Sequence, residues 1–191
     1  MADVNERDAK LIQYLGEAYG KERELETALN AHITMTTRPA YKKRLKEHLR
    51  ETKRHAKEVE RRIKKLGGGG QSTQTLLGKA MAAAKGPMHM VRGGSEQEKM
   101  LKNAKTEYFN EHEEIATYTA IETLAENVGD KETAKLARQI RRDEERMARF
   151  LEGQIKVLTA AVVQEEIPAS QRRSNGRARS RSRSPAGARS K

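Results

Sequence analysis

The chain has 191 residues, no cysteine and a formal net charge of +12 at pH 7. The lack of cysteine excludes disulfides, thiolate metal centres and thiol catalysis, and no apolar run approaches the roughly 20 residues of a membrane span. The polar start, MADVNERDAK, lacks the apolar stretch of a secretory signal peptide. We therefore expect a cytoplasmic protein without a transmembrane segment, long enough for one domain with a sizeable core.

Two amphipathic helices are predicted in the first third of the chain. Residues 6–35 place apolar side chains three and four positions apart, with charged residues between them. A second stripe of this kind covers residues 39–66, where Pro39 suits the first turn and a glycine run from Gly67 ends the helix. Because the connection between the two helices is short, they should pack antiparallel.

Two further helices are predicted over residues 95–128 and 131–164. Ser95 and Glu98 match the capping box that begins many helices. Asp130 is suited to cap the last helix. No segment alternates with a period of two, so the pattern predicts an all-α fold.

The connections predict the topology of the bundle. Residues 67–94 form a long connection with glycine-rich ends and a short amphipathic piece from Leu76 to Ala84. Two helical hairpins joined by one long crossover are typical of ferritin-like four-helix bundles, whereas up-down-up-down bundles have only short loops. The predicted fold class is therefore a ferritin-like four-helix bundle with its crossover between the second and third helices.

Each predicted helix carries a carboxylate near its midpoint, in or beside the phase of its apolar stripe. These acids are Glu22 in the first helix, Glu51 in the second, Glu111 and Glu114 in the third, and Glu144 in the fourth. Because helix midpoints coincide in a bundle, the acids should share one layer. Buried carboxylates without partners would repel one another and would take up protons or bind cations.

Oxygen ligands together with an imidazole favour iron or manganese over a thiolate-preferring ion. His55 follows Glu51 by one helical turn and could supply the nitrogen, and His48 shares the same face. The alternative is that the glutamates flank the core and form structural ion pairs with Lys or Arg. The chain supplies such cations at Lys21, Arg50, Arg54 and Arg141.

Four sequence segments resemble the YciE/YciF-type ferritin-like proteins. They are AYGKERELETAL, EHLRETKRHAKEVERRI, EHEEIATYTAIETLAENVG and RDEERMARFLE, one in each helix. The resemblance implies a carboxylate-bridged dinuclear site in a usually oligomeric protein associated with bacterial stress responses. It places Glu22, Glu51, Glu114 and Glu144 at the positions of the family glutamates.

The sequence departs from the Glu-x-x-His motif that di-iron carboxylate proteins carry on two helices. Arg54 stands three residues after Glu51, with His55 one place later, and Met147 stands three residues after Glu144. One imidazole is therefore displaced and the other is missing. This departure favours a carboxylate-rich or mononuclear site as the alternative to a complete dinuclear one.

The end of the chain has a different composition. Residues 171–191 contain seven arginines, one lysine and no acid. Such a segment has too little apolar surface to fold and is predicted to be disordered. Its charge is suited to bind phosphate backbones without sequence specificity; the alternatives are a solvated or assembly tail and an anionic membrane or polyphosphate surface. The arginines are Arg172, Arg173, Arg177, Arg179, Arg181, Arg183 and Arg189.

Together these features predict a ferritin-like domain over residues 1–166 and a basic tail over residues 167–191. The predicted function is binding of iron or manganese in a stress-related role, with metal oxidation or peroxide consumption as the activity if the protein is an enzyme. A homo-oligomer, a dimer or larger, is expected. Nucleic acid is a candidate partner of the tail and would place the protein at the nucleoid. The alternative function is a non-enzymatic stress or interaction protein.

Overall fold

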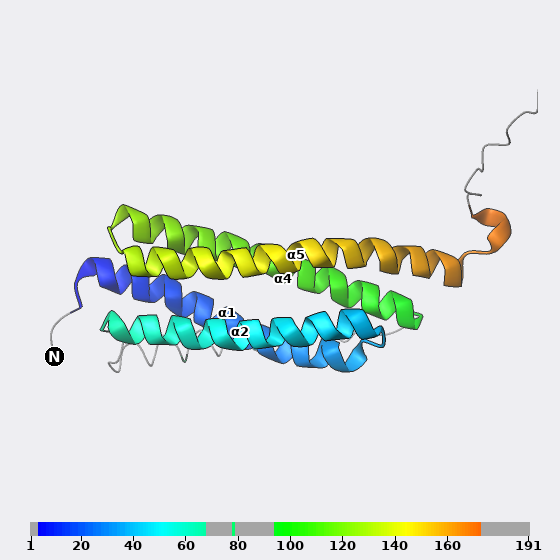
Figure 1. Cartoon of the computed structure of the whole chain (residues 1–191), viewed down its shortest axis with the longest axis horizontal. Helices are drawn as coiled ribbons and strands as arrows, with labels where there is room; N and C mark the ends of the chain where they lie inside the picture. The colour runs from blue at the N-terminus through cyan, green and yellow to red at the C-terminus, as the bar shows by residue number, and fades with distance from the viewer. Residues whose placement is uncertain (1–3, 68–77, 79–93, 173–191) are drawn as a thin grey trace, which may run out of the picture.

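The structure is a computed structural model that describes residues 4–67, 78 and 94–172. These residues form four long α-helices and one short 3-10 helix (Figure 1). The elements are α1 Glu6–Met35, α2 Pro39–Lys65, α4 Glu96–Asn127, α5 Lys131–Glu166 and η1 Ala169–Gln171. The all-α prediction is confirmed, and the helix bounds differ from the predicted ones by no more than two residues.

Side chains at the helix starts satisfy backbone N–H groups that have no partner within the helix. The hydroxyl of Ser95 accepts a hydrogen bond from the Glu98 N–H at 3.2 Å, as the capping box predicts. The carboxylate of Asp130 accepts one from the Thr133 N–H at 3.0 Å. Pro39 occupies the first turn of α2, where its missing N–H leaves no helical hydrogen bond unmade.

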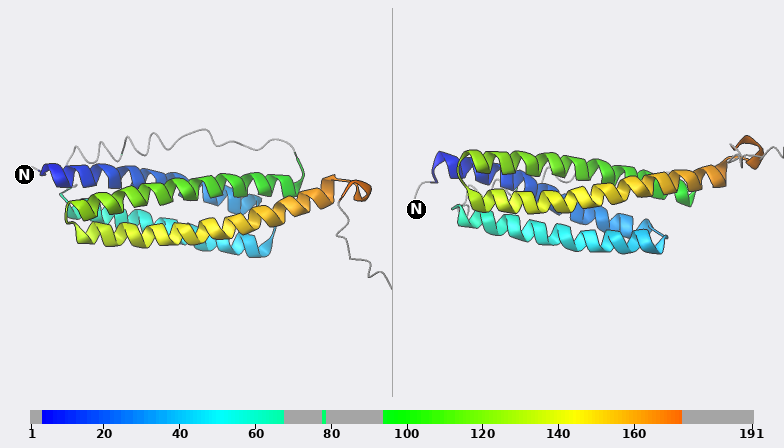
Figure 2. Two further views of the ribbon diagram at one scale, coloured as in Figure 1. Left: turned by 90° about the horizontal axis from the view of Figure 1, so that it is seen from above. Right: turned by 45° about the horizontal axis from the view of Figure 1, so that its top comes forward.

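The four helices form two antiparallel hairpins, α1 with α2 and α4 with α5, and the hairpins pack through α1 on α4 and α2 on α5 (Figures 1 and 2). The end of α2 and the start of α4 lie at opposite ends of the bundle. This is the predicted ferritin-like connectivity, with one long crossover. The amphipathic piece predicted at Leu76 to Ala84 lies outside the described residues apart from Gly78.

Two apolar clusters fill the ends of the bundle. One lies where α1 begins and includes Leu15, Ile63 and Ile140. The other lies where α1 ends and includes Leu29 and Leu151. The mid-helix layer between them holds buried polar side chains. None of the described helices has the sustained apolar stretch that crossing a bilayer requires.

Candidate metal centre

Two histidines of α2 organise the centre of the bundle. His48 and His55 are both fully buried, and Thr52 between them is 1% exposed. Two helical turns separate the histidines, so both rings lie on the inward face of α2, roughly 10 Å apart along its axis. Each ring faces a different group of carboxylates.

The first group joins three helices. The Nδ1 atom of His55 lies 2.9 Å from Glu144 Oε1 on α5 and 3.5 Å from Glu22 Oε1 on α1. Neither contact is aligned as a hydrogen bond, and Nδ1 has no such partner among the described residues. Three potential ligand atoms therefore approach one another without binding each other, as they would around a shared cation.

The second group lies beside the first and shares one residue with it. The Nε2 atom of His48 lies 3.0 Å from Glu111 Oε1 on α4 and 3.8 Å from Glu144 Oε2. Glu144 thus turns one carboxylate oxygen toward each histidine. A carboxylate in this position can bridge two ions.

The far side of each imidazole contacts an outer carboxylate. His55 Nε2 is 3.1 Å from Asp143 Oδ2, and Arg54 donates to that oxygen at 2.6 Å. His48 Nδ1 is 3.2 Å from Glu51 Oε2, to which Arg44 donates at 3.0 Å. Metal-binding histidines are commonly oriented by a carboxylate on their second nitrogen. Both rings are therefore held with the other nitrogen directed into the centre.

The centre contains buried carboxylate oxygens that accept no hydrogen bond from the described residues. Tyr118 donates to Glu22 Oε1 at 2.6 Å and leaves the second oxygen free. The atoms of this layer that have no hydrogen-bond partner among residues 4–67, 78 and 94–172 are Glu22 Oε2, Glu111 Oε2, Glu114 Oε1, both oxygens of Glu144 and His55 Nδ1. Buried polar atoms are rarely left unpaired, so the donor set fits a bound cation.

The acids and the histidines set each other's charge. Burial alone would lower the pKa of His55, but Asp143, Glu144 and Glu22 raise it to about 12. Burial would also lower the pKa of His48, which Glu111 and Glu51 raise well above its ordinary value. Without a metal ion, the positive charge facing the acids therefore comes from two imidazoliums.

Burial affects the carboxylates unequally, because the histidines offset it to different degrees: the pKa of Glu111 is still raised to about 8 by burial although His48 lowers it. Burial raises the pKa of Glu22, and it raises that of Glu114, where Glu22, Glu144 and Glu111 add to the effect. It would raise the pKa of Glu144 as well, but His55 and His48 outweigh burial and lower it. Glu144 is therefore the ionised acid at the centre of the layer.

The structure brings four of the predicted site residues together, namely Glu22, His55, Glu111 and Glu144. Glu114 is 2% exposed and lies close enough to Glu22, Glu144 and Glu111 to feel their charges, but it belongs to neither group. Glu51 is half-buried and contacts the outer side of His48.

Sequence reasoning noted His48 on the face of His55 but did not count it among the ligands, and it missed Asp143. The sequence suggested that one imidazole was absent, whereas His48 supplies a second one from the same helix as His55. The signal was present, since His48 lies in the inward phase two turns before His55. Asp143 was overlooked because its neighbour Glu144 fits the apolar stripe better.

Three of the four cations named for the ion-pair alternative contact other acids. Lys21 pairs with Glu113 at 2.8 Å, and Arg141 pairs with Glu122 at 3.1 Å. Arg54 binds the outer carboxylate of Asp143, as described above. Among the described residues, Arg50 has no carboxylate at ion-pair distance. Of the five predicted ligand glutamates, only Glu51 pairs with an arginine, Arg44, among the described residues.

A second buried pair lies on the side of the layer where α1 ends. His32 Nδ1 contacts Glu107 Oε1, and Glu107 is fully buried one turn before Glu111. The hydroxyl of Tyr41 is buried nearby without a partner among the described residues. Burial raises the pKa of Tyr41, and Glu107 and Glu111 raise it further. The polar interior therefore extends one turn beyond the two histidine groups.

The basic tail is described only at its start. Arg172 donates to the carbonyl oxygens of Ile167 and Gln164, at 2.6 Å and 2.7 Å, and so lies against the end of α5. The other six predicted nucleic-acid-binding arginines lie outside the described residues.

A four-helix bundle with one long crossover and a central layer of carboxylates and histidines is the architecture expected of a YciE/YciF-type protein. The chain belongs to the family described as Domain of unknown function (DUF892), whose model matches residues 6–164. The resemblance inferred from the sequence is thereby confirmed. No curated protein matches the chain.

Solved structures show the same fold. A protein from Xanthomonas campestris pv. campestris str. ATCC 33913 is 24% identical, with a TM-score of 0.67 over 85% of this chain and 99% of that one. YcfI from Rhodopseudomonas palustris is 20% identical, with a TM-score of 0.61 over 79% and 96%. The E. coli stress protein YciF is 19% identical, with a TM-score of 0.56 over 87% and 100%.

Proposed function

We propose that the bundle centre binds iron or manganese, as one ion or as a dinuclear site. The ligands would be Glu22, His48, His55, Glu111 and Glu144, with Glu114 beside them. The observation that carries this proposal is Glu144, whose two buried oxygens lack a donor among the described residues and face different histidine groups. Glu51, which the sequence placed among the ligands, would instead orient His48.

Mixed carboxylate and imidazole donors suit iron and manganese. Bound there, either metal would supply one-electron redox chemistry, and we propose metal oxidation or peroxide consumption as the activity. The protein's own residues would position the ligands: Tyr118 holds Glu22, and Asp143 holds His55. The E. coli protein YciF, which has the same fold, is a stress protein, and this supports a protective role.

Metal analysis of Glu144→Gln tests the proposal. Glu145→Gln is the matched control, because Glu145 follows on α5 but pairs with Arg141 at the surface. We expect wild-type protein purified without chelator from iron- and manganese-supplemented medium to contain one or two ions per chain. Glu144→Gln should lose affinity by more than the 10- to 100-fold, roughly, that outer-shell changes cost, and Glu145→Gln should match wild type.

Wild-type protein without stoichiometric metal would contradict the proposal and favour the non-enzymatic alternative. Equal metal content in Glu144→Gln and wild type would show that the metal does not bind at the shared carboxylate. If metal binds, oxygen- and peroxide-dependent oxidation of added Fe²⁺ then shows whether the site is catalytic.

We also propose that the basic tail binds nucleic acid, which would place a metal-binding bundle next to DNA in the cytoplasm. The support is its composition, seven arginines without an acid. Replacing these arginines by glutamine in the full chain should weaken binding to duplex DNA at low salt; unchanged binding would reject the role of the tail. The predicted homo-oligomer stays a prediction.

A further inference from the structure

The outer face of α2 is a continuous basic stripe. From Tyr41 to Lys65, every exposed residue of this helix is a lysine or an arginine. They recur at intervals of three and four residues along the whole helix, so they share one face. We call this set the α2 stripe: Lys43, Lys46, Arg50, Lys53, Arg54, Lys57, Arg61, Lys64 and Lys65.

The charge of the stripe is not a general property of the bundle. Helix α2 contains twelve lysines and arginines against four glutamates, and all four glutamates are half-buried. Helix α4 has the opposite balance, three lysines against eight glutamates. The folded domain is therefore polarised, with its positive charge concentrated on α2.

Much of the stripe is available to an external partner. Lys53 and Lys64 contact acids of the bundle, at 3.5 Å from Glu26 and 2.6 Å from Glu60. Five other members have no carboxylate at ion-pair distance among the described residues. These are Lys43, Lys46, Arg50, Lys57 and Arg61.

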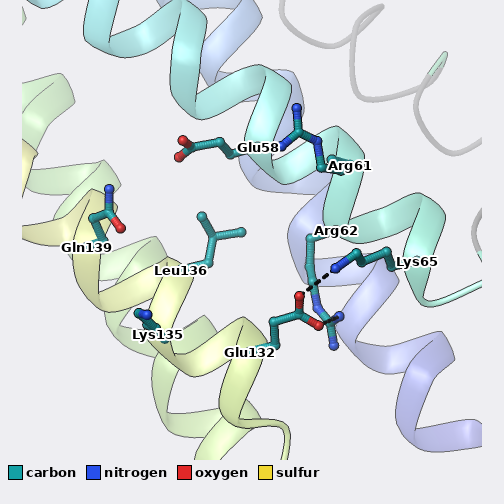
Figure 3. A pocket seen from close by; sticks show the side chains of 8 residues that line it. All are labelled: Glu58, Arg61, Arg62, Lys65, Glu132, Lys135, Leu136 and Gln139. Carbon is teal, nitrogen blue, oxygen red and sulfur yellow. Dashed lines mark hydrogen bonds and ion pairs between the residues drawn. The ribbon is translucent and has the colours of Figure 1, made fainter.

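A surface groove between α2 and α5 lies at one end of the stripe (Figure 3). Arg61 and Lys65 line it from α2, and Lys135 lines it from α5. Glu132 neutralises part of this wall through Lys65, at 2.7 Å. Glu58 also lines the groove, whereas Arg61 and Lys135 have no carboxylate at ion-pair distance among the described residues, so the four cations of the groove outnumber its two acids.

We propose that the α2 stripe binds the phosphate backbone of duplex nucleic acid, independently of the tail and of the metal centre. From Lys43 to Lys64 the stripe is about 32 Å long, close to the ~34 Å of one duplex turn. Lysine and arginine bind phosphate oxygens without reading the bases. Binding should therefore be insensitive to sequence and strongly salt-dependent.

The composition of the stripe favours duplex nucleic acid over a membrane surface or a single strand as the binding partner. Membrane-surface helices insert an apolar face beside their charges, but the large exposed apolar residues of the described chain lie elsewhere: Val4, Met35, Phe109, Val157 and Ile167. Single-strand binding uses aromatic side chains on which bases stack, and Tyr41, the aromatic residue of α2, is buried. A duplex backbone needs neither feature.

The test uses the full chain with the seven tail arginines replaced by glutamine, so that only the bundle can bind. In this background, one variant carries Lys46→Gln, Arg50→Gln, Lys57→Gln and Arg61→Gln. The matched control carries Lys10→Gln, Lys99→Gln, Lys105→Gln and Lys131→Gln, which removes the same charge from α1, α4 and α5. All eight positions are exposed and lack a carboxylate partner among the described residues.

Fluorescence anisotropy measures binding of two 30-base-pair duplexes of unrelated sequence. We expect the tail-substituted protein to bind both equally, the stripe variant to bind at least about tenfold more weakly, and its slope of log K against log salt to fall by up to about 4. The control should stay within about twofold. Circular dichroism and metal content verify that each variant is folded.

Three results would overturn the proposal: no duplex binding by the tail-substituted protein, an equal loss in the control, or tighter binding to single strands or to phosphatidylserine vesicles. Stripe-dependent self-association without duplex binding would also overturn it, in favour of the acidic α4 face of a second copy as the partner. We expect Glu144→Gln, which should lose metal, to bind duplex as wild type does, and this separates the test of the stripe from that of the proposed metal site.

Discussion

The middle of the bundle and its two ends bury different kinds of side chain. The ends bury aliphatic and aromatic side chains against one another, whereas the middle buries carboxylates and histidines on all four helices. Burial of apolar surface stabilises a fold, but buried ionisable groups contribute little net stability and often reduce it. The ends therefore hold the helices together, whereas the middle layer gives up stability to keep the ionisable groups that the proposed metal site would need.

Truncation of an apolar side chain at an end should have the largest effect. Leu151 is fully buried in the cluster where α1 ends, so Leu151→Ala should lower the free energy of unfolding by about 2–5 kcal/mol through lost burial and a cavity. Urea denaturation followed by circular dichroism measures it. Val157→Ala, at an exposed position on the same helix, is the control and should change little. A loss below about 1 kcal/mol for Leu151→Ala would contradict the inference that the apolar ends stabilise the fold.

The sequence predicted the apolar ends well because they depend on local pattern. Apolar spacing fixes which face of each helix turns inward, and Ser95 and Asp130 mark where two helices begin. The layer was also predictable, since helix midpoints coincide. The rotation within the layer was not: neighbouring residues of a helix point about 100° apart, and Thr52 rather than Glu51 occupies the inward position.

Contacts between helices account for the rest of what the sequence could not show. His32 pairs with Glu107 because α1 packs against α4, and no local pattern connects two residues so far apart in the chain. The two roles of Glu144 depend in the same way on its distances to His48 and His55. Such arrangements are fixed by tertiary packing, which periodicity alone does not determine.

A substitution in the middle layer should raise the free energy of unfolding instead of lowering it. Burial and neighbouring carboxylates raise the pKa of Glu114, and its Oε1 has no partner among the described residues. Glu114→Leu should therefore stabilise the metal-free protein by about 1–3 kcal/mol. Its neighbour Glu113 pairs with Lys21 at the surface, so Glu113→Leu is the control. Destabilisation by Glu114→Leu in chelator-treated protein would show that the layer supports the fold.

The smallest expected effect concerns a charge at the end of the bundle, where acids have partners. Burial would raise the pKa of Asp130, but hydrogen bonds from Thr133 and Arg62 outweigh it and lower the pKa. A lowered folded-state pKa means that the carboxylate stabilises the protein above its unfolded pKa, near 4. That contribution is lost as the pH falls through the lower, folded-state value.

Asp130→Asn isolates this contribution, because asparagine caps a helix about as well as aspartate but cannot form the ion pair with Arg62, which is 2.5 Å long. We expect a loss of about 1 kcal/mol at pH 7 that shrinks as the pH falls below the unfolded pKa, near 4, measured by urea denaturation across this range. The ion pair between Asp130 and Arg62 is formed by two side chains of the bundle and needs no added ion, in contrast to the proposed metal site. Metal removal should therefore leave the difference between Asp130→Asn and wild type unchanged, and a metal-dependent difference would show that the end and the middle of the bundle are coupled.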